Sequence, residues 1–172
     1  MLYETTMSTP VGVLTLVASD AGLRAVLWHT EKPNRVPLPD RAGGEVDPNG
    51  VLAMTRAQLD EYFAGTRTEF DLALDPQGTD FQQAAWMALR SIPFAETVSY
   101  GEQARRMGDS RKARAVGAAN GRNPLSIVVP CHRVVGADGS LTGFAAGIDT
   151  KSWLLSHERL VAAATASVSR SN

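Results

Sequence analysis

The sequence has very few of the residues that build disulfide and metal frameworks. Cys131 is the only cysteine, and histidine occurs three times in 172 residues. A single cysteine excludes an internal disulfide and any zinc site made from several cysteines. The thiol must therefore be explained by itself, either as a small buried side chain or as a reactive group.

Long apolar runs and targeting features are also missing. No apolar stretch approaches the roughly 20 residues that span a bilayer. The opening MLYETTMSTPVG lacks the basic and apolar regions of a secretory signal. No glycine-rich phosphate loop stands between a strand and a helix. We therefore expect a soluble protein of a reducing cytoplasm, with no membrane contact.

Charge of either sign is unevenly distributed, although the formal net charge is only -1. Residues 1–80 carry 6 lysines and arginines against 12 acidic residues, whereas residues 81–172 carry 11 against 6. A basic half attracts polyanions through its summed field. Any polyanionic partner is therefore expected on the C-terminal part.

The first half of the chain has the pattern of a small α+β domain, which we place at residues 1–75. Prolines and paired glycines predict an irregular loop over Thr30–Gly50, and the apolar spacing of Val51–Ala64 predicts a helix. Short turn sequences between the first three strands favour an antiparallel meander. The predicted strands are Leu2–Met7, Val13–Ser19, Leu23–His29 and Glu69–Leu74.

From residue 76 the pattern becomes mainly helical. Thr79 and Gln82 have the spacing of a capping box, and Pro93 stops the helix that follows. The apolar face of that helix is predicted to contain Phe81, Ala85, Trp86, Leu89 and Ile92.

Two further helices, Tyr100–Met107 capped by Ser99 and the basic Arg111–Gly121, form a helix-turn-helix pattern. A last helix is predicted at Lys151–Leu160. We place the second domain at residues 76–160 and expect the small, polar tail 161–172 to be disordered.

The run IVVPCHRVVG places His132 directly after Cys131. A cysteine becomes a nucleophile when a neighbouring base or positive charge favours its thiolate. Adjacent side chains on a strand point to opposite faces, so the two can cooperate only where the backbone turns. Pro130 and Gly136 favour such a turn. Glu158 is a candidate to orient the histidine, although its spacing alone favours a solvated helix residue. A packed, inert cysteine is the alternative.

The segment ARAVGAANG, residues 113–121, is a slim helix with few bulky side chains. A helix that reads the major groove usually carries long polar side chains. A slim helix with a central arginine, Arg114, suits the narrow minor groove. Tight packing of this helix in a core would explain the small residues equally well.

Four segments together resemble one family: SYGE at 99–102, ARAVGAANGRNP at 113–124, PCHRVVG at 130–136 and KSWLLSHE at 151–158. They are similar to the O6-alkylguanine-DNA alkyltransferases, which repair methylated and other O6-alkylated guanines. The resemblance is dense over residues 79–158 and looser before them. It implies an α+β chain with a ribonuclease H-like N-terminal domain and a winged-helix-like helix-turn-helix. It also implies irreversible alkyl transfer, once per chain and without a cofactor.

The resemblance assigns roles to single residues. Cys131 would accept the alkyl group, His132 would act as its water-linked base, and Glu158 would orient the histidine. Asn123 would brace the turn before the active-site loop. Tyr100 would contact the target nucleotide and stabilise the guanine as it leaves.

The implied partner is double-stranded DNA, bound in the minor groove without sequence preference. Arg114 would fill the space that the flipped base leaves. We expect a monomer in solution that can assemble cooperatively on DNA. The other expected DNA contacts are Tyr100, Lys112, Ala113, Ala115, Gly117 and Arg122. The guanine pocket is expected to contain Val134, Phe144, Ala145 and Ala146.

Two features depart from the family. The pocket loop commonly has two glycines where this chain has Ala146-Gly147, so we expect reduced tolerance of bulky adducts such as benzyl. Some members bind zinc in the N-terminal domain through cysteine and histidine, but His29 is the only such residue there. We therefore expect no metal.

Three other functions compete with alkyl transfer. One is a binding protein: non-transferring relatives bind alkylated DNA but lack the cysteine. The presence of Cys131 argues against this function. A cysteine hydrolase would leave the helix-turn-helix without a purpose. A transcription regulator would need a recognition helix with longer side chains than residues 113–121 provide.

Overall fold

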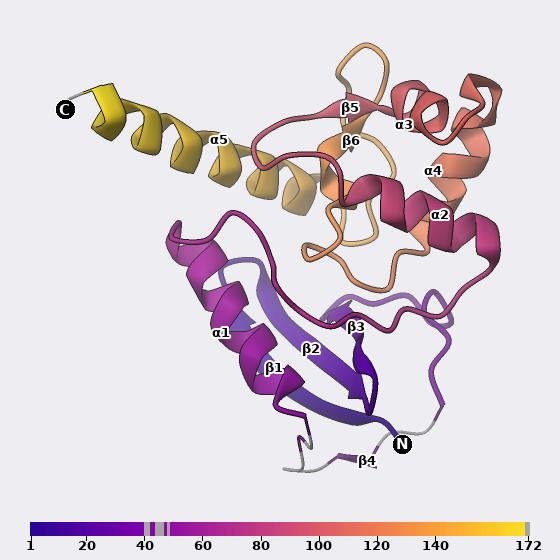
Figure 1. Cartoon of the computed structure of the whole chain (residues 1–172), viewed down its shortest axis with the longest axis vertical. Helices are drawn as coiled ribbons and strands as arrows, with labels where there is room; N and C mark the ends of the chain where they lie inside the picture. Colours follow the sequence, from indigo (N-terminus) through magenta and orange to yellow (C-terminus); the bar gives the residue numbers. More distant parts are fainter. Residues whose placement is uncertain (40–41, 44–46, 48, 171–172) are drawn as a thin grey trace.

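The computed structural model describes residues 1–39, 42–43, 47 and 49–170. A sheet with one helix across it forms the lower part of the molecule in Figure 1, and helices and loops form the upper part. The architecture is α+β, as expected. Within the described residues, no helix is long and apolar enough to cross a bilayer.

Three antiparallel strands form the predicted meander: β1 (Tyr3–Thr9), β2 (Gly12–Ser19) and β3 (Gly22–Trp28). The sheet order is β3-β2-β1-β4, in which β4 (Ala42–Gly43) pairs in parallel with β1. The predicted irregular loop therefore contains a short strand. Part of that loop, residues 40–41, 44–46 and 48, lies outside the described residues.

Helix α1 (Val51–Ala64) has the predicted bounds and lies across the sheet (Figure 1). The strand predicted at Glu69–Leu74 is wrong, because none of the named strands of the described chain contains this segment; it makes only an isolated parallel bridge to β3, between Leu74 and Leu23. The amide of Gln58 bonds both the N–H and the carbonyl of Asp71, at 2.9 Å each. The Gln58 side chain thus bonds the backbone N–H and carbonyl of Asp71, which a neighbouring strand would otherwise bond.

The capping box predicted before the next helix is present. The Thr79 hydroxyl accepts from the Gln82 N–H, and the Gln82 side chain accepts from the Thr79 N–H. Helix α2 (Asp80–Leu89) follows. Most of its predicted apolar face is buried, and Phe81 at its start is half-buried.

The helix-turn-helix is present, but its second helix begins later than predicted. Helix α3 (Tyr100–Arg106) is capped by Ser99. Residues Ser110–Lys112 form a 3-10 turn, η1, and α4 covers Ala113–Gly121. Two short strands were not predicted: β5 (Val98–Ser99) pairs in parallel with β6 (Val134–Val135). This pairing places the start of α3 beside the residues that follow Cys131.

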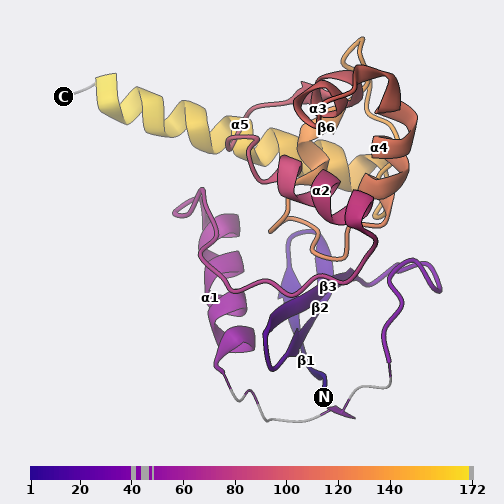
Figure 2. The same cartoon turned by 45° about the vertical axis from the view of Figure 1, so that its right-hand side comes forward.

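The last helix, α5 (Ile148–Arg170), is longer than predicted at both ends. The expected disordered tail is wrong for residues 161–170, which continue the helix. Four alanines in this stretch explain the difference, because alanine has the highest helix propensity. Residues 171–172 lie outside the described part. The C-terminal end of α5 extends away from the rest of the chain in Figure 1 and Figure 2.

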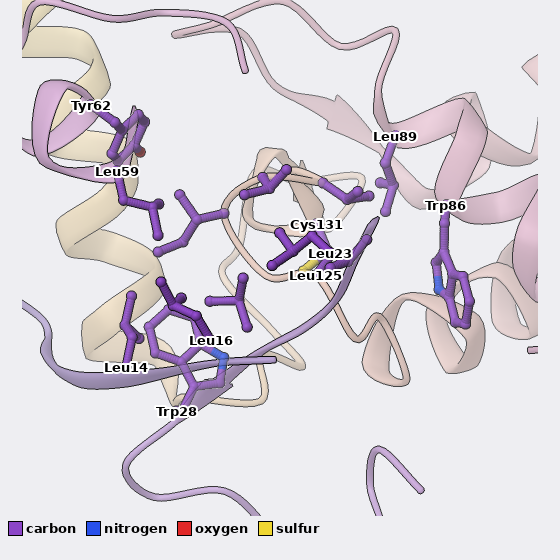
Figure 3. Packing of buried hydrophobic residues seen from close by; sticks show 14 of the residues in the cluster. Leu14, Leu16, Leu23, Trp28, Leu59, Tyr62, Trp86, Leu89, Leu125 and Cys131 are labelled. Carbon is purple, nitrogen blue, oxygen red and sulfur yellow. The ribbon is translucent and has the colours of Figure 1, made fainter. Parts of the chain in front are cut away.

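One hydrophobic core joins the two parts of the chain (Figure 3). Leu14, Leu16 and Leu23 of the sheet belong to the same cluster as Leu89 and Cys131. Backbone bonds also cross between the parts, since the N–H of Val26 donates to the Pro124 carbonyl at 2.8 Å. The candidate nucleophile therefore lies where the two parts meet.

Candidate active site

The Asn123 side chain makes two hydrogen bonds to the backbone of the segment that leads to Cys131. Its side-chain oxygen accepts from the Leu125 N–H at 3.0 Å, and its amide nitrogen donates to the Val129 carbonyl at 2.8 Å. Between these two bonds Ile127 is buried with φ of 74°, a conformation that costs energy for a β-branched residue. The Asn123 side chain thus links the two ends of this loop.

Cys131 begins a 3-10 turn, η2 (Cys131–Arg133). The backbone therefore bends where the sequence analysis requires a bend, and cysteine and histidine do not point to opposite faces of a strand. Burial raises the pKa of the Cys131 thiol. A hydrogen bond from Asn123 and the charges of Arg35 and Lys151 act in the opposite direction. The resting side chain is therefore a thiol that needs a base before it can react.

His132 and Glu158 form a fully buried pair, with 2.6 Å between His132 Nε2 and Glu158 Oε2. Burial lowers the pKa of His132, although the hydrogen bond and charge of Glu158 act against this. A neutral ring that donates from Nε2 has its lone pair on Nδ1. Nδ1 is buried and has no hydrogen-bond partner among the described residues. This arrangement provides a base with a free acceptor nitrogen.

Glu158 has three partners that the sequence analysis missed. Arg133 donates to both carboxylate oxygens, from Nε at 2.8 Å and from Nη2 at 3.2 Å. The Ala95 N–H donates to Oε1 at 3.1 Å, and the Tyr62 hydroxyl donates to Oε2 at 2.7 Å. Burial would raise the pKa of Glu158, but the hydrogen bonds and charges of His132 and Arg133 lower it well below its usual range. The carboxylate therefore stays ionised in the core.

Tyr100 begins α3, and its hydroxyl donates to the Thr142 carbonyl at 3.1 Å. Burial, with a contribution from the charge of Cys131, raises the pKa of Tyr100, so the phenol remains a neutral donor. Lys151, another residue that the sequence analysis missed, is fully buried and donates to the Val134 and Thr142 carbonyls at 2.5 and 3.0 Å. Its Nζ lies 5.8 Å from the centre of the Tyr100 ring.

The predicted pocket residues all belong to one hydrophobic cluster or pack against it. Phe144, Ala145 and Ala146 are half-buried and pack against the core cluster that contains Cys131 and Val134. The Phe144 ring lies 5.6 Å from that of Trp28, edge to face. Ala146 does not have a positive φ. Its methyl group therefore acts through its volume and not through backbone strain.

Helix α4 has one buried face and one slim exposed face. Val116, Ala119 and Asn120 are buried, whereas Arg114 and Ala115 are exposed. Arg114 makes no side-chain hydrogen bond or ion pair with any residue that the structure describes, so its guanidinium is available to a partner. The helix is therefore packed on one side, as the alternative of a core helix expects, and accessible on the other.

The remaining residues predicted to contact DNA differ in their exposure and in the contacts that they already make within the protein. Ala113 and Gly117 are half-buried, and a Cβ on Gly117 would lie 3.6 Å from the Tyr100 ring. Lys112 is exposed, with Nζ 5.7 Å from the centre of the Phe81 ring. Arg122 donates to the carbonyls of Asn34 and Arg35 at 3.0 and 3.3 Å. It therefore links α4 to the N-terminal part in the free protein.

Comparison with known proteins gives a consistent result over nearly the whole chain. Residues 80–160 match the model of the 6-O-methylguanine DNA methyltransferase, DNA binding domain, and residues 2–76 match its ribonuclease-like domain. The methylated-DNA--protein-cysteine methyltransferase of Mycobacterium tuberculosis is 48% identical over 92% of this chain and 93% of its own. That of Methanosarcina acetivorans is 42% identical over 91% and 98%.

Solved structures agree with the sequence relatives. The crystal structure of Mycobacterium tuberculosis OGT in complex with DNA has a TM-score of 0.83 and 43% identity, covering 92% of this chain and 94% of that one. That structure shows a relative of the same fold bound to DNA. With the site's geometry and the matched residues taken together, the chain belongs to the O6-alkylguanine-DNA alkyltransferase family.

Proposed function

We propose that this protein repairs O6-alkylguanine, mainly O6-methylguanine, in duplex DNA by transferring the alkyl group to Sγ of Cys131. The observation that carries the proposal is the buried turn in which Cys131 precedes His132. The histidine bonds Glu158 through Nε2, and no residue in the described part of the chain bonds its Nδ1. The comparisons support it, because relatives named methylated-DNA--protein-cysteine methyltransferase match nearly the whole chain.

The target base must first leave the double helix, since its O6 substituent cannot reach a buried thiol from within the stack. Flipping a nucleotide costs a few kcal/mol. Arg114 projects from the exposed face of α4 and can fill the vacated space. The slim face of this helix fits the narrow minor groove, where contacts carry little sequence information. Binding is therefore largely independent of sequence.

Transfer then proceeds in one displacement. The Cys131 thiol gives its proton, through a water, to Nδ1 of His132, and Glu158 stabilises the imidazolium that forms. The thiolate attacks the alkyl carbon, so a sulfur–carbon bond forms as the carbon–O6 bond breaks. The bonding electrons leave with guanine, and a hydrogen bond from the neutral Tyr100 hydroxyl stabilises this developing anion.

The product on the protein is a thioether, which has no simple route back to a thiol. Each chain therefore acts once, as a reagent. No cofactor takes part in these steps. We place the protein in the cytoplasm, because the reaction needs a reduced thiol and access to DNA.

Intact-protein mass spectrometry tests the proposal. The protein is incubated with a short duplex that contains one O6-methylguanine, beside a Cys131→Ser variant. The expected result is a gain of one CH₂ on the wild type alone, which stops at one per chain. Tight binding of the lesion without a gain in mass would overturn alkyl transfer and favour a protein that only marks the lesion.

A further inference from the structure

A side chain of the N-terminal part bonds directly to the carboxylate of Glu158. Tyr62 lies on α1, and its hydroxyl donates to Glu158 Oε2 at 2.7 Å. The same oxygen bonds His132 Nε2 at 2.6 Å. Among the described residues that bond this carboxylate, Tyr62 alone belongs to the first 75 residues. The hydroxyl and the imidazole thus share one acceptor atom.

Tyr62 is held firmly enough to fix the position of that atom. It is fully buried between α1 and α5 (Figure 3). The rings of Phe63, Phe70 and Phe94 surround it, with centroid distances of 5.2, 5.7 and 6.2 Å. His157 Nε2 donates to the Tyr62 carbonyl at 2.8 Å. Two successive residues of α5, His157 and Glu158, therefore hold the backbone and the hydroxyl of one tyrosine.

The chemistry of the hydroxyl suits this role. Burial, together with the charge and hydrogen bond of Glu158, raises the pKa of Tyr62 far above its usual value, so it remains a donor at every physiological pH. A donor on Oε2 restrains rotation of the carboxylate. It thereby keeps the His132 ring in the orientation that leaves Nδ1 free for the proton of Cys131.

We infer that Tyr62 is a positioning residue for alkyl transfer, through which the N-terminal part completes the Glu158–His132 relay. This inference rests on the proposed function. It goes beyond a supporting role for the first 75 residues, because one of their side chains then affects the rate of alkyl transfer. A core tyrosine that merely satisfies its hydroxyl would affect stability and leave the rate's pH dependence unchanged.

The test is the pH profile of alkyl transfer from free O6-benzylguanine, which removes DNA binding from the measurement. Tyr62→Phe deletes the hydroxyl and keeps the ring, and Tyr3→Phe on β1 is the matched control. We expect Tyr62→Phe to slow transfer at neutral pH on the order of tenfold. We also expect the profile to move to higher pH, because the thiol must then ionise with less help from His132. Tyr3→Phe leaves both quantities unchanged.

Two results with an active wild type would overturn the inference alone. One is an unchanged profile with a lowered urea midpoint, which indicates a purely structural tyrosine. The other is a shift of the profile to lower pH. It would indicate that the Tyr62 hydroxyl only makes the Glu158 carboxylate less basic, and so makes His132 a weaker base. No transfer by the wild type to either free base or duplex would instead overturn the proposed function, and this inference with it. His157→Gln loosens Tyr62 but keeps its hydroxyl, so a smaller upward shift is expected there even if Tyr62→Phe does not fold.

Discussion

The turn that carries Cys131 and the helix that carries Arg114 use charge in opposite ways. Against the turn, Glu158 of α5 is buried with Arg133 and His132, and hydrogen bonds compensate its charge on both oxygens. On α4, Arg114 is exposed and unpaired within the described structure. In the proposed function, the buried residues control protonation and the exposed helix provides a cation to DNA. Mutations around the buried turn should therefore change the transfer chemistry, and mutations on α4 should change the recognition of DNA.

The largest effect is expected from Glu158→Gln. It leaves Arg133 as an uncompensated buried charge, so the free energy of unfolding should fall by about 3–5 kcal/mol. Transfer should also slow by at least about a hundredfold on duplex and on free base alike, because His132 loses its orienting partner. Urea unfolding and single-turnover rates check both, with the exposed Glu96→Gln as control. Normal rates on either substrate would contradict the relay.

The same variant carries a pH prediction. Because the pKa of Glu158 is lowered in the folded state, its carboxylate contributes stability that is present above the ordinary carboxyl pKa of about 4.3. This contribution is lost as pH falls from that value toward the folded-state pKa. The stability difference between wild type and Glu158→Gln should therefore narrow below about pH 4. A constant difference down to acid unfolding would argue against an ionised Glu158.

Arg114→Ala should have the next largest effect, and on one substrate only. Repair of duplex DNA should fall about 10–100-fold, because filling the vacated stack offsets part of a flipping cost of a few kcal/mol. Reaction with free O6-benzylguanine should not change. Arg159→Ala, which removes an exposed arginine of α5, is the matched control. Equal losses of rate on both substrates would contradict the claim that Arg114 acts in DNA recognition and not in alkyl transfer itself.

Ala146→Gly should have the smallest effect. Removing the methyl group widens the pocket without relieving backbone strain, since Ala146 does not have a positive φ. The benzyl-to-methyl rate ratio should rise by about tenfold, the low end of the roughly 10–200-fold (about 1–3 kcal/mol) that one methylene can contribute in an apolar pocket. An unchanged ratio in a fully active variant would show that this methyl does not limit adduct size.

The sequence predicted most of what local patterns can encode. The meander, α1, the capping box at Thr79 and the Ser99 cap all depend on neighbouring residues and are confirmed. The predicted strand at Glu69–Leu74 failed for a tertiary reason, because its alternation is real but Gln58 takes the hydrogen bonds of Asp71. The prediction of a disordered tail was wrong for residues 161–170, because it underestimated the helix propensity of their alanines.

The candidate site divides in the same way. Cys131, His132 and Glu158 were found from their motifs, and Arg133 stands in the same run and could have been found as a charge beside a buried pair. Tyr62 could not, because it is 96 residues from Glu158 in the chain and looks like an ordinary apolar helix position. No spacing rule connects residues that meet only through folding.

The most direct test of the account is the protonation state of His132, read from the ¹⁵N chemical shifts of its ring. The chain has three histidines, so comparison with a His132→Asn variant assigns the signals. We predict a neutral ring at pH 7, with the proton on Nε2 and a bare Nδ1, persisting below the ordinary histidine pKa of about 6.5. A proton on Nδ1 at pH 7, in either a neutral or a charged ring, would contradict the account, because His132 could not then accept the proton of Cys131.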